Sequence, residues 1–419
     1  MTKKSDAPAI RFKGFSDAWE QRKLGDMMNV TSVKRIHQSD WTDSGVRFLR
    51  ARDIVAAAKN EEPDDYLYIS KEKYEEYSAL SGKVGVSDLL VTGVGTIGVP
   101  YLVRNLEPLY FKDGNIIWFQ NSDKIDGKFL FYSFSAEQIQ GFINESAGIG
   151  TVGTYTIESG KKTPISLPNQ IEQAKVGEFF QQLDNLITLH QRKFEKLTNV
   201  KKSMLEKMFP QNGSSYPEIR FKGFTDPWEQ RKLGELVDRV VRKNINNEST
   251  LPLTISAQYG LVDQITYFNN RVASRDVSNY YLVLNGEFAY NKSTSDGYPF
   301  GAVKRLDLYE KGVLSTLYIV FAPKKEQQID SDYLTVFFDT DRWHKGVAER
   351  AAEGARNHGL LNISAEDFFD IDLSVPKDIV EQKQIGAFIR QLDNLITLHQ
   401  RELEKLQNIK KSMLEKMFV

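Results

Sequence analysis

The chain of 419 residues contains no cysteine. Disulfide bonds and thiolate metal sites are therefore excluded, and we expect the protein in a reducing cytoplasm. The five histidines are scattered, and none has another metal ligand at a useful spacing. No apolar run approaches the roughly 18 residues of a membrane-spanning helix. The charged N-terminus is not followed by the apolar core of a signal peptide.

The chain also lacks an excess of charge of either sign. The chain has 55 lysines and arginines against 56 acidic residues, which gives a net charge of −1. The overall charge therefore does not draw the protein to nucleic acid, and any DNA-binding surface has to be a local patch.

Catalytic motifs are absent as well. The sequence has no Walker A lysine motif, no HExxH and no GxSxG. Gly93 to Gly98 and Gly148 to Gly153 each match GxGxxG, but neither match opens a helix that could hold a pyrophosphate. We expect a chain that carries no cofactor or metal and does no chemistry itself.

What the sequence does contain is a repeat. Ile10 to Gly25 returns as Ile219 to Gly234 with two changes, and a block beginning at Leu183 returns at Leu392. The same offset of 209 residues separates both pairs. The segments between the repeated blocks have little sequence in common. This pattern indicates one scaffold that presents two different surfaces.

The second repeated block predicts a long helix. From Ile171 to Met208 the chain has no proline, and its apolar residues recur at steps of four and three, as in a coiled coil. The two copies are expected to pair antiparallel with internal two-fold pseudosymmetry and to separate two lobes. The seam residues, which are also candidates for partner docking, are Leu183, Ile187, His190, Leu197 and Met204, and Leu392, Ile396, His399, Leu406 and Met413.

Each helix has two polar residues on its seam, a histidine and a lysine. For His190 and His399 a buried histidine satisfied by a neighbour is favoured over a metal pair. Lys201 and Lys410 are expected to fix the register of the two helices, at some cost in stability.

Each lobe is expected to be α+β. Apolar runs predict strands in the first lobe at Val46–Leu49, Leu89–Thr92, Val99–Val103 and Asn115–Phe119, and in the second at Tyr281–Leu284, Glu287–Tyr290 and Val313–Phe321. Polar and aromatic loop residues lie between them. Such loops suit hydrogen bonds to bases and phosphates, but they also suit ordinary turns.

The opening Trp-Glu-Gln-Arg-Lys-Leu-Gly, the Pro and Glu-Gln that close each lobe, and Leu-Asp-Asn-Leu-Ile-Thr-Leu-His-Gln-Arg occur twice, in register. In these motifs and their order the chain resembles the specificity subunit of type I restriction-modification systems. The resemblance covers essentially the whole chain. It implies target recognition domains at residues 1–165 and 213–374, and conserved helical regions at residues 166–212 and 375–419.

The resemblance also implies a function. Each lobe reads one half of a bipartite, asymmetric sequence in double-stranded DNA, and the helices set the spacing and dock two adenine-N6 methyltransferase subunits. Nuclease-translocase subunits join for cleavage; S-adenosylmethionine, ATP and Mg belong to these partners. Our candidates for DNA contact are Thr92, Thr96, Tyr101, Lys112 and Tyr155 in the first lobe, and Asn291, Lys292, Ser293, Tyr298, Arg356 and His358 in the second.

Other functions stay open on the sequence alone. The same architecture could serve a type II-like restriction-modification enzyme. A structural coiled-coil adaptor for protein partners would account for the neutral net charge. A stand-alone nucleotide-dependent enzyme would need one of the glycine motifs to bind nucleotide.

Overall fold

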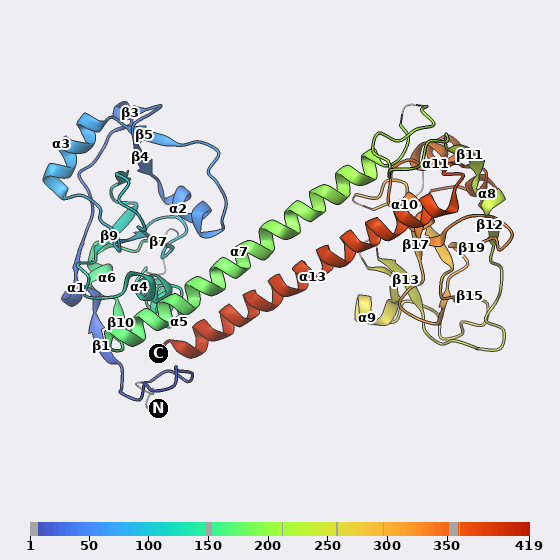
Figure 1. The fold of residues 1–419 in the computed structure, drawn as a ribbon. Coiled ribbons are helices and arrows are strands. Elements are labelled where there is room, and N and C mark those ends of the chain that lie inside the picture. The colour runs from blue at the N-terminus through green and yellow to red at the C-terminus, as the bar shows by residue number, and fades with distance from the viewer. Residues whose placement is uncertain are drawn as a thin grey trace. The chain divides into compact units, whose positions relative to one another are not determined.

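A computed structural model describes residues 7–147, 153–211, 213–256, 259–295, 297–351, 359 and 361–419. The chain divides into two compact units, Met1–Arg192 with His399–Val419, and Lys193–Leu398. Each unit contains a lobe of strands and short helices together with one stretch of each long helix (Figure 1). The first unit therefore joins segments that lie far apart in the sequence.

The lobe of the first unit is built on two four-stranded sheets. Their strand orders are β2-β9-β6-β7 and β3-β5-β4-β8, and only the β4-β8 pair is parallel. A two-stranded sheet pairs β1, from the repeated opening block, with β10 just before the long helix. The strands are β1 (Glu20–Lys23), β2 (Asn29–Thr31), β3 (Trp41–Thr42), β4 (Val46–Leu49), β5 (Leu67–Ile69), β6 (Leu89–Thr92), β7 (Pro100–Leu102), β8 (Leu109–Phe111), β9 (Ile116–Gln120) and β10 (Pro164–Leu167).

Short helices cover these sheets, and several begin at a capping side chain. Ser70 caps α3, Asp126 caps α4 and Thr156 caps α6, each by accepting a hydrogen bond from a backbone N–H of the first turn. The helices are α1 (Leu24–Met27), η1 (Gln38–Asp40), α2 (Ala51–Ala58), α3 (Lys71–Ser81), α4 (Gly127–Ser133), α5 (Glu137–Ser146) and α6 (Ile157–Lys162).

The lobe of the second unit repeats part of this plan. Its four-stranded sheet has the order β12-β19-β16-β17, and β11 pairs with β20 as β1 does with β10. Two further antiparallel two-stranded sheets are β13-β14, which are consecutive strands, and β15-β18, which are separated in the chain by β16 and β17. The strands are β11 (Glu229–Lys232), β12 (Val237–Arg239), β13 (Leu253–Ser256), β14 (Gly260–Asp263), β15 (Tyr281–Leu284), β16 (Phe288–Asn291), β17 (Ala302–Arg305), β18 (Lys311–Leu314), β19 (Ile319–Pro323) and β20 (Asp372–Val375), and the short helices are α8 (Leu233–Leu236), α9 (Gln264–Phe268), α10 (Ser331–Phe338), α11 (His344–Ala351) and α12 (Ala365–Phe369).

One predicted strand is wrong. The apolar run Val313–Phe321 forms two strands, β18 and β19, which belong to different sheets. Between them the N–H of Tyr318 donates to the carbonyl of Ser315 at 3.2 Å, which closes a turn. Only Ser315 and Thr316 interrupt the apolar residues at this turn, and such a short interruption does not separate two strands in the hydrophobic pattern.

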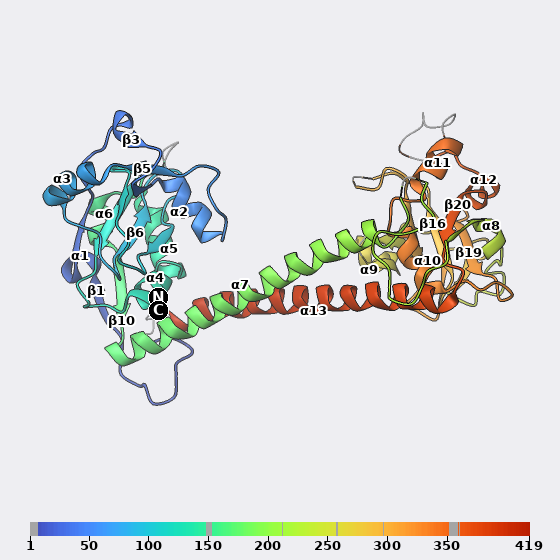
Figure 2. The same cartoon turned by 45° about the horizontal axis from the view of Figure 1, so that its top comes forward.

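The predicted long helices are confirmed as α7 (Gln170–Lys207) and α13 (Ile379–Met417). Asn169 and Asp378 cap them, since their side chains accept from the N–H groups of Glu172 and Val380. α7 begins in the first unit and ends in the second, whereas α13 begins in the second and ends in the first. Inside each unit the two helices therefore run antiparallel, as predicted (Figures 1 and 2). None of the described helices has the length and apolar character that a bilayer crossing requires.

The repeated motifs attach each lobe to its long helix by an ion pair. Arg11 donates to both oxygens of Glu172 at 2.8 and 2.6 Å, and Arg220 does the same to Glu381 at 2.7 and 2.8 Å. Both carboxylates are 1% exposed. Because an Arg–carboxylate fork fixes both distance and angle, the opening block sets how the helix leaves the lobe.

The Glu-Gln motif adds a second attachment. The amide oxygen of Gln173 accepts from the N–H of Asp126 at 3.0 Å, and its amide nitrogen donates to the carbonyl of Pro168 at 2.8 Å. Gln382 makes the equivalent bonds to Asp330 and Pro376, at 2.8 and 2.9 Å. The repeated residues thus form the frame, and the sequence between them is free to differ.

Each lobe also buries the C-terminal end of the opposite long helix. Phe418, after α13, packs against Trp19, Phe129 and Phe180, with ring centroids 5.4–6.3 Å apart. Phe209, which follows α7, is 1% exposed and packs against aromatic rings of the second lobe: Trp228, Tyr333 and Phe337. Trp19 and Trp228, each 4% exposed, are accordingly packing residues.

A glycine in each long helix allows it to approach the lobe closely. A Cβ atom on Gly177 would lie 2.8 Å from Asp126 Oδ1 and 2.8 Å from Lys128 Cβ. Gly141, inside α5, has nothing within 4 Å of the same position. We expect Gly177→Ala to lower the free energy of unfolding by about 1–3 kcal/mol through overpacking, and Gly141→Ala to raise it by up to about 1 kcal/mol. Urea unfolding of both variants measures this, and equal effects would contradict the close contact.

Candidate nucleic-acid interface

The turn between β6 and β7 contains the first group of predicted contact residues. Thr92 is fully buried; its hydroxyl donates to the carbonyl of Thr96 at 2.6 Å and accepts from the N–H of Val99 at 2.9 Å. Thr96 is exposed near the tip. Thr92 therefore shapes the loop, and Thr96 is the residue of this pair that can meet a ligand. The strands β6 and β7 form an antiparallel hairpin, so the first glycine motif opens no nucleotide-binding helix.

The other first-lobe candidates differ in exposure. Tyr155 is 2% exposed, and its hydroxyl lies 2.5 Å from the Thr163 hydroxyl, so it belongs to the core. Burial raises the pKa of this phenol well above its usual value. Tyr101 on β7 and Lys112 after β8 are half-buried and keep surface for a contact.

The second-lobe candidates lie in the loop after β16. The Asn291 carboxamide oxygen accepts from the N–H of Ser293 at 3.0 Å, Lys292 Nζ donates to the carbonyl of Ile363 at 3.3 Å, and Tyr298 is 36% exposed. The Thr294 N–H donates to the carbonyl of Gly359 at 2.6 Å, which brings two loops together. Arg356 and His358 lie outside the described residues.

The two groups of loops occupy the same place in their sheets. β6 lies between β9 and β7 in the first lobe, and β16 lies between β19 and β17 in the second. In this register Thr92 and Asn291 are both the last residue of the corresponding strand. The predicted contacts Thr96 and Ser293 therefore belong to equivalent loops with different sequences. The residue-level assignments to DNA stay predictions.

Six of the predicted apolar seam residues share a core across the two helices, three in each unit. In the first unit Leu183 is 7% exposed and shares a core with Leu406 and Met413; in the second, Leu392 is 8% exposed and shares a core with Leu197 and Met204. The remaining apolar seam residues, Ile187 and Ile396, are half-buried.

Polar seam residues pair across the helices, as expected for a register device. Lys410 Nζ lies 2.6 Å from Asp184 in the first unit, and Lys201 Nζ lies 2.7 Å from Asp393 in the second. His190 and His399 contact each other in the first unit, with Nδ1 atoms 3.1 Å apart, so one ring donates to the other. This is the satisfied histidine favoured above. Across the described ranges, no cluster of three or more His, Asp or Glu side chains could hold a metal ion.

Sequence reasoning missed an exposed apolar face on the long helices. Leu186 and Leu189 on α7 are 43% and 45% exposed, and their repeats Leu395 and Leu398 on α13 are 43% and 51% exposed. They lie in the repeated block but outside the seam. A two-stranded coiled coil needs apolar residues mainly along its seam. Leucines outside the seam in both copies of the repeat could therefore have indicated this exposed face from the sequence.

A second ion-pair network ties the helices to the lobe of the second unit. Asp339, which follows α10, accepts from Lys304 Nζ at 2.8 Å and from Lys201 Nζ at 3.4 Å, and its side chain is 19% exposed. Burial alone would raise the pKa of the Asp339 carboxyl, but the two ammonium groups outweigh it and hold the pKa below its usual value.

This depressed pKa predicts a pH dependence. The ionised Asp339 contributes stability above its unfolded pKa of about 3.9 and loses it as pH falls through the lower folded pKa. Asp339→Asn should therefore cost about 1–3 kcal/mol at pH 7, and the difference from wild type should shrink below about pH 4. Urea unfolding of both proteins between pH 3.5 and 7 measures this. A difference that grows on acidification would contradict it.

Comparison with known proteins agrees with this organisation. The model of the type I restriction modification DNA specificity domain family matches residues 16–199 and again residues 225–408. The chain is 27% identical over 200 residues to the type I restriction enzyme MjaVIII specificity subunit of Methanocaldococcus jannaschii, which covers 45% of this chain and 44% of that protein. It is 29% identical over 171 residues to a Haemophilus influenzae protein named as a type I restriction enzyme specificity subunit, covering 40% and 41%.

These alignments span less than half the length of either curated relative. A solved structure, the S subunit of a type I restriction-modification system from M. genitalium, matches over 99% of both chains with a TM-score of 0.61 and 14% identity, which establishes a shared fold. Because the family model covers most of the chain in two copies, this protein belongs to the family of type I restriction-modification DNA specificity domains.

Proposed function

We propose that this chain is the DNA specificity subunit of a type I restriction-modification complex, working in the cytoplasm. Each lobe reads one half of a bipartite, asymmetric target in double-stranded DNA. The observation that carries this proposal is the pair of equivalent loops, after β6 and β16, which share a scaffold but differ in sequence. Two unlike loops on one frame suit two unlike half-sites.

Contact with bases and phosphates is assigned to the candidates whose side chains are accessible. Thr96, Tyr101 and Lys112 in the first lobe, and Asn291, Ser293 and Tyr298 in the second, keep exposed or half-buried side chains. Hydroxyl and amide groups can read base edges, and lysine can neutralise a phosphate. Arg356 and His358 remain candidates from the sequence.

Two methyltransferase subunits are assigned to the helices, where Leu186 with Leu189, and Leu395 with Leu398, offer the same exposed apolar pair twice. The identical pairs favour two copies of one partner. The chain itself is proposed as non-catalytic. S-adenosylmethionine would be held by the methyltransferase, and ATP and Mg by the nuclease-translocase subunits that join the complex.

The spacing between the two half-sites is proposed to depend on the long helices. The 38 residues of α7 correspond to about 57 Å at about 1.5 Å per residue, longer than one turn of DNA, about 34 Å. We expect insertion of four residues between Leu186 and Met204, matched by the same insertion in α13, to change the spacer length and leave both half-site sequences intact. Methylation mapping measures the spacer length and the half-site sequences together. Altered half-site bases would contradict the proposal that the long helices set the spacing.

The proposal is tested by mapping DNA methylation in single molecules. Cells expressing this chain with its methyltransferase subunit are compared with cells expressing the methyltransferase alone. New N6-methyladenine in one bipartite motif with unlike halves is the expected result. A stable complex of the two proteins that adds no methylation would favour a protein-binding adaptor, and a partner that is a fused methylase-nuclease would favour the type II-like arrangement.

A further inference from the structure

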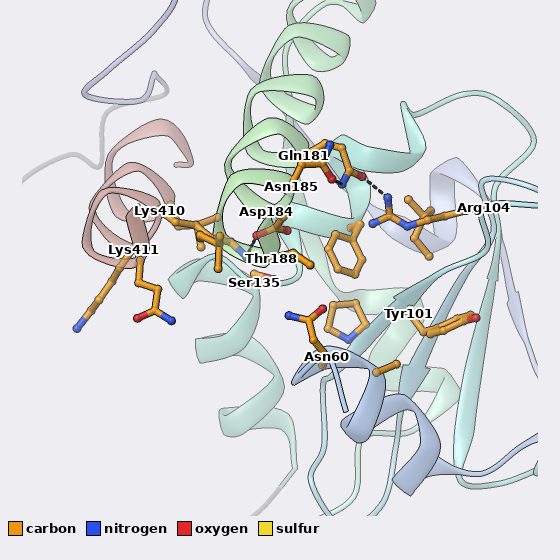
Figure 3. Close-up of a pocket in the computed structure, with 18 of the residues that line it drawn as sticks. Asn60, Tyr101, Arg104, Ser135, Gln181, Asp184, Asn185, Thr188, Lys410 and Lys411 are labelled. Atoms are coloured by element: carbon orange, nitrogen blue, oxygen red, sulfur yellow. Dashed lines mark hydrogen bonds and ion pairs between the residues drawn. The ribbon is translucent and has the colours of Figure 1, made fainter. Parts of the chain in front are cut away.

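The first unit contains a cavity of about 1050 Å³, bounded by its lobe and by the stretches of α7 and α13 that belong to that unit. Figure 3 shows Lys410 and Asp184 on one side of it, with Arg104 and Tyr101 across from them. The charged residues in its lining are Arg104, Glu137, Asp184, Lys410, Lys411 and Glu415. The cavity is of the size that binds a ligand or an inserted protein segment.

In the second unit, the helix surface equivalent to the one around Lys410 is in contact with the lobe. Lys201 repeats Lys410 at the offset of 209 residues, and it contacts two carboxylates: Asp393 across the helix pair at 2.7 Å, and Asp339 from the lobe at 3.4 Å. Lys410 contacts Asp184, the counterpart of Asp393, at 2.6 Å. The lobe carboxylate is the partner that differs between the two units.

The residue of the first lobe that corresponds to Asp339 can be identified from the packing. Gly177 meets Lys128 and Phe129 of α4, and its repeat Gly386 meets Asp332 and Tyr333 of α10, so residues of these two helices correspond at an offset of 204.

At this offset Ser135 takes the place of Asp339, and Ser135 lines the cavity. The strand register likewise matches Tyr101 of β7 to Lys304 of β17. The Lys304–Asp339 pair of the second unit is thus replaced in the first by two uncharged hydroxyl residues.

The lining distinguishes between two classes of anion that could approach Lys410. The charges of the three basic and three acidic side chains in the cavity lining cancel. The cavity therefore attracts a polyanion such as the DNA backbone only weakly. Apolar walls are provided by Leu102, Phe131, Ile187 and Leu414. A phosphodiester has no apolar surface to place against them, whereas a protein segment can carry a carboxylate among apolar side chains.

We propose that this cavity receives an acidic side chain carried on an apolar-faced segment of the methyltransferase subunit, and that Lys410 binds its carboxylate. The inference rests on the proposed function and gives one of its partners a specific contact. Since the second unit satisfies its own lysine with Asp339, the two methyltransferase subunits bind to unequal sites. One copy uses the cavity, and the other finds that the equivalent lysine already contacts a second carboxylate, Asp339 of the lobe.

The test introduces into the first lobe the carboxylate that the second lobe already has. Ser135 is exposed, so Ser135→Asp is expected to fold and to direct its own carboxylate toward Lys410. Stepwise dissociation constants of the two methyltransferase subunits from the full-length chain are measured by native mass spectrometry. We expect one constant to rise by about tenfold or more and the other to stay unchanged. The matched control is Ser44→Asp, an exposed residue outside the cavity lining that adds the same charge.

Each outcome decides a different point. Unchanged constants for Ser135→Asp, with a wild-type complex that assembles and methylates DNA, overturn the cavity contact alone. Normal assembly combined with weaker DNA binding by the complex also overturns it, in favour of a phosphate contact. A wild-type chain that forms no complex with the methyltransferase overturns the proposed function and this inference together.

Discussion

Arg220→Met is expected to destabilise the second unit by about 3–5 kcal/mol, because it leaves the carboxylate of Glu381 buried without its cation. Glu381 is 1% exposed, and its charged partner is Arg220 at 2.7 and 2.8 Å; Trp228 Nε1 adds one hydrogen bond at 3.3 Å. A single neutral donor does not compensate a buried negative charge. Urea unfolding followed by tryptophan fluorescence measures the loss, since Trp228 lies beside the broken pair.

A surface ion pair of the same residue types provides the control. Arg22 pairs with Glu20 at 2.5 Å, but their side chains are 48% and 64% exposed. Arg22→Met should change the free energy of unfolding by less than about 1 kcal/mol. If both variants cost the same, burial of Glu381 is not what makes Arg220 important.

Phe209→Ala is expected to cost about 3–5 kcal/mol, the range for truncating a fully buried phenylalanine. The Phe209 ring has centroid distances of 5.8 Å to Trp228, 5.8 Å to Tyr333 and 6.2 Å to Phe337. These residues surround it on several sides, so the structure cannot collapse easily into the space that the ring leaves. The midpoint of urea unfolding should fall without a change in slope.

Phe268 at the end of α9 is the matched control, because this residue is 47% exposed. Phe268→Ala removes the same atoms and should cost less than about 1 kcal/mol. A small effect at Phe209 would mean that the end of α7 is not anchored in the lobe.

The features that could be predicted from the sequence are those with a long, regular pattern. The helix expected at Ile171–Met208 is found at Gln170–Lys207, because the steps of four and three persist over the whole segment. The seam and its lysine pairs follow from the same periodicity and from the repeat. The strands of the lobes are short, and the turn at Ser315–Tyr318 inside an apolar run could not be recognised from local pattern.

The binding residues were harder to predict because exposure depends on partners distant in sequence. Thr92 and Tyr155 have the chemistry of contact residues, yet Thr92 is used by its own turn and Tyr155 by Thr163. The match between Ser135 and Asp339 is hidden because the lobes have diverged and their helices correspond at an offset of 204, not 209. The packing of Gly177 and Gly386 makes that alignment visible, and the equivalent hydrogen bonds of Gln173 to Asp126 and Gln382 to Asp330 agree with it.

The ring of Phe418 inside the first lobe has a consequence for synthesis on the ribosome. The second unit is the continuous segment Lys193–Leu398, whereas the first unit needs residues 399–419 to complete its core. At about 5–20 residues per second, the first lobe waits on the order of 10–45 s with Phe129 and Phe180 uncovered. The half of the protein that is made first is therefore the half whose core is completed last, and it exposes apolar surface while translation continues.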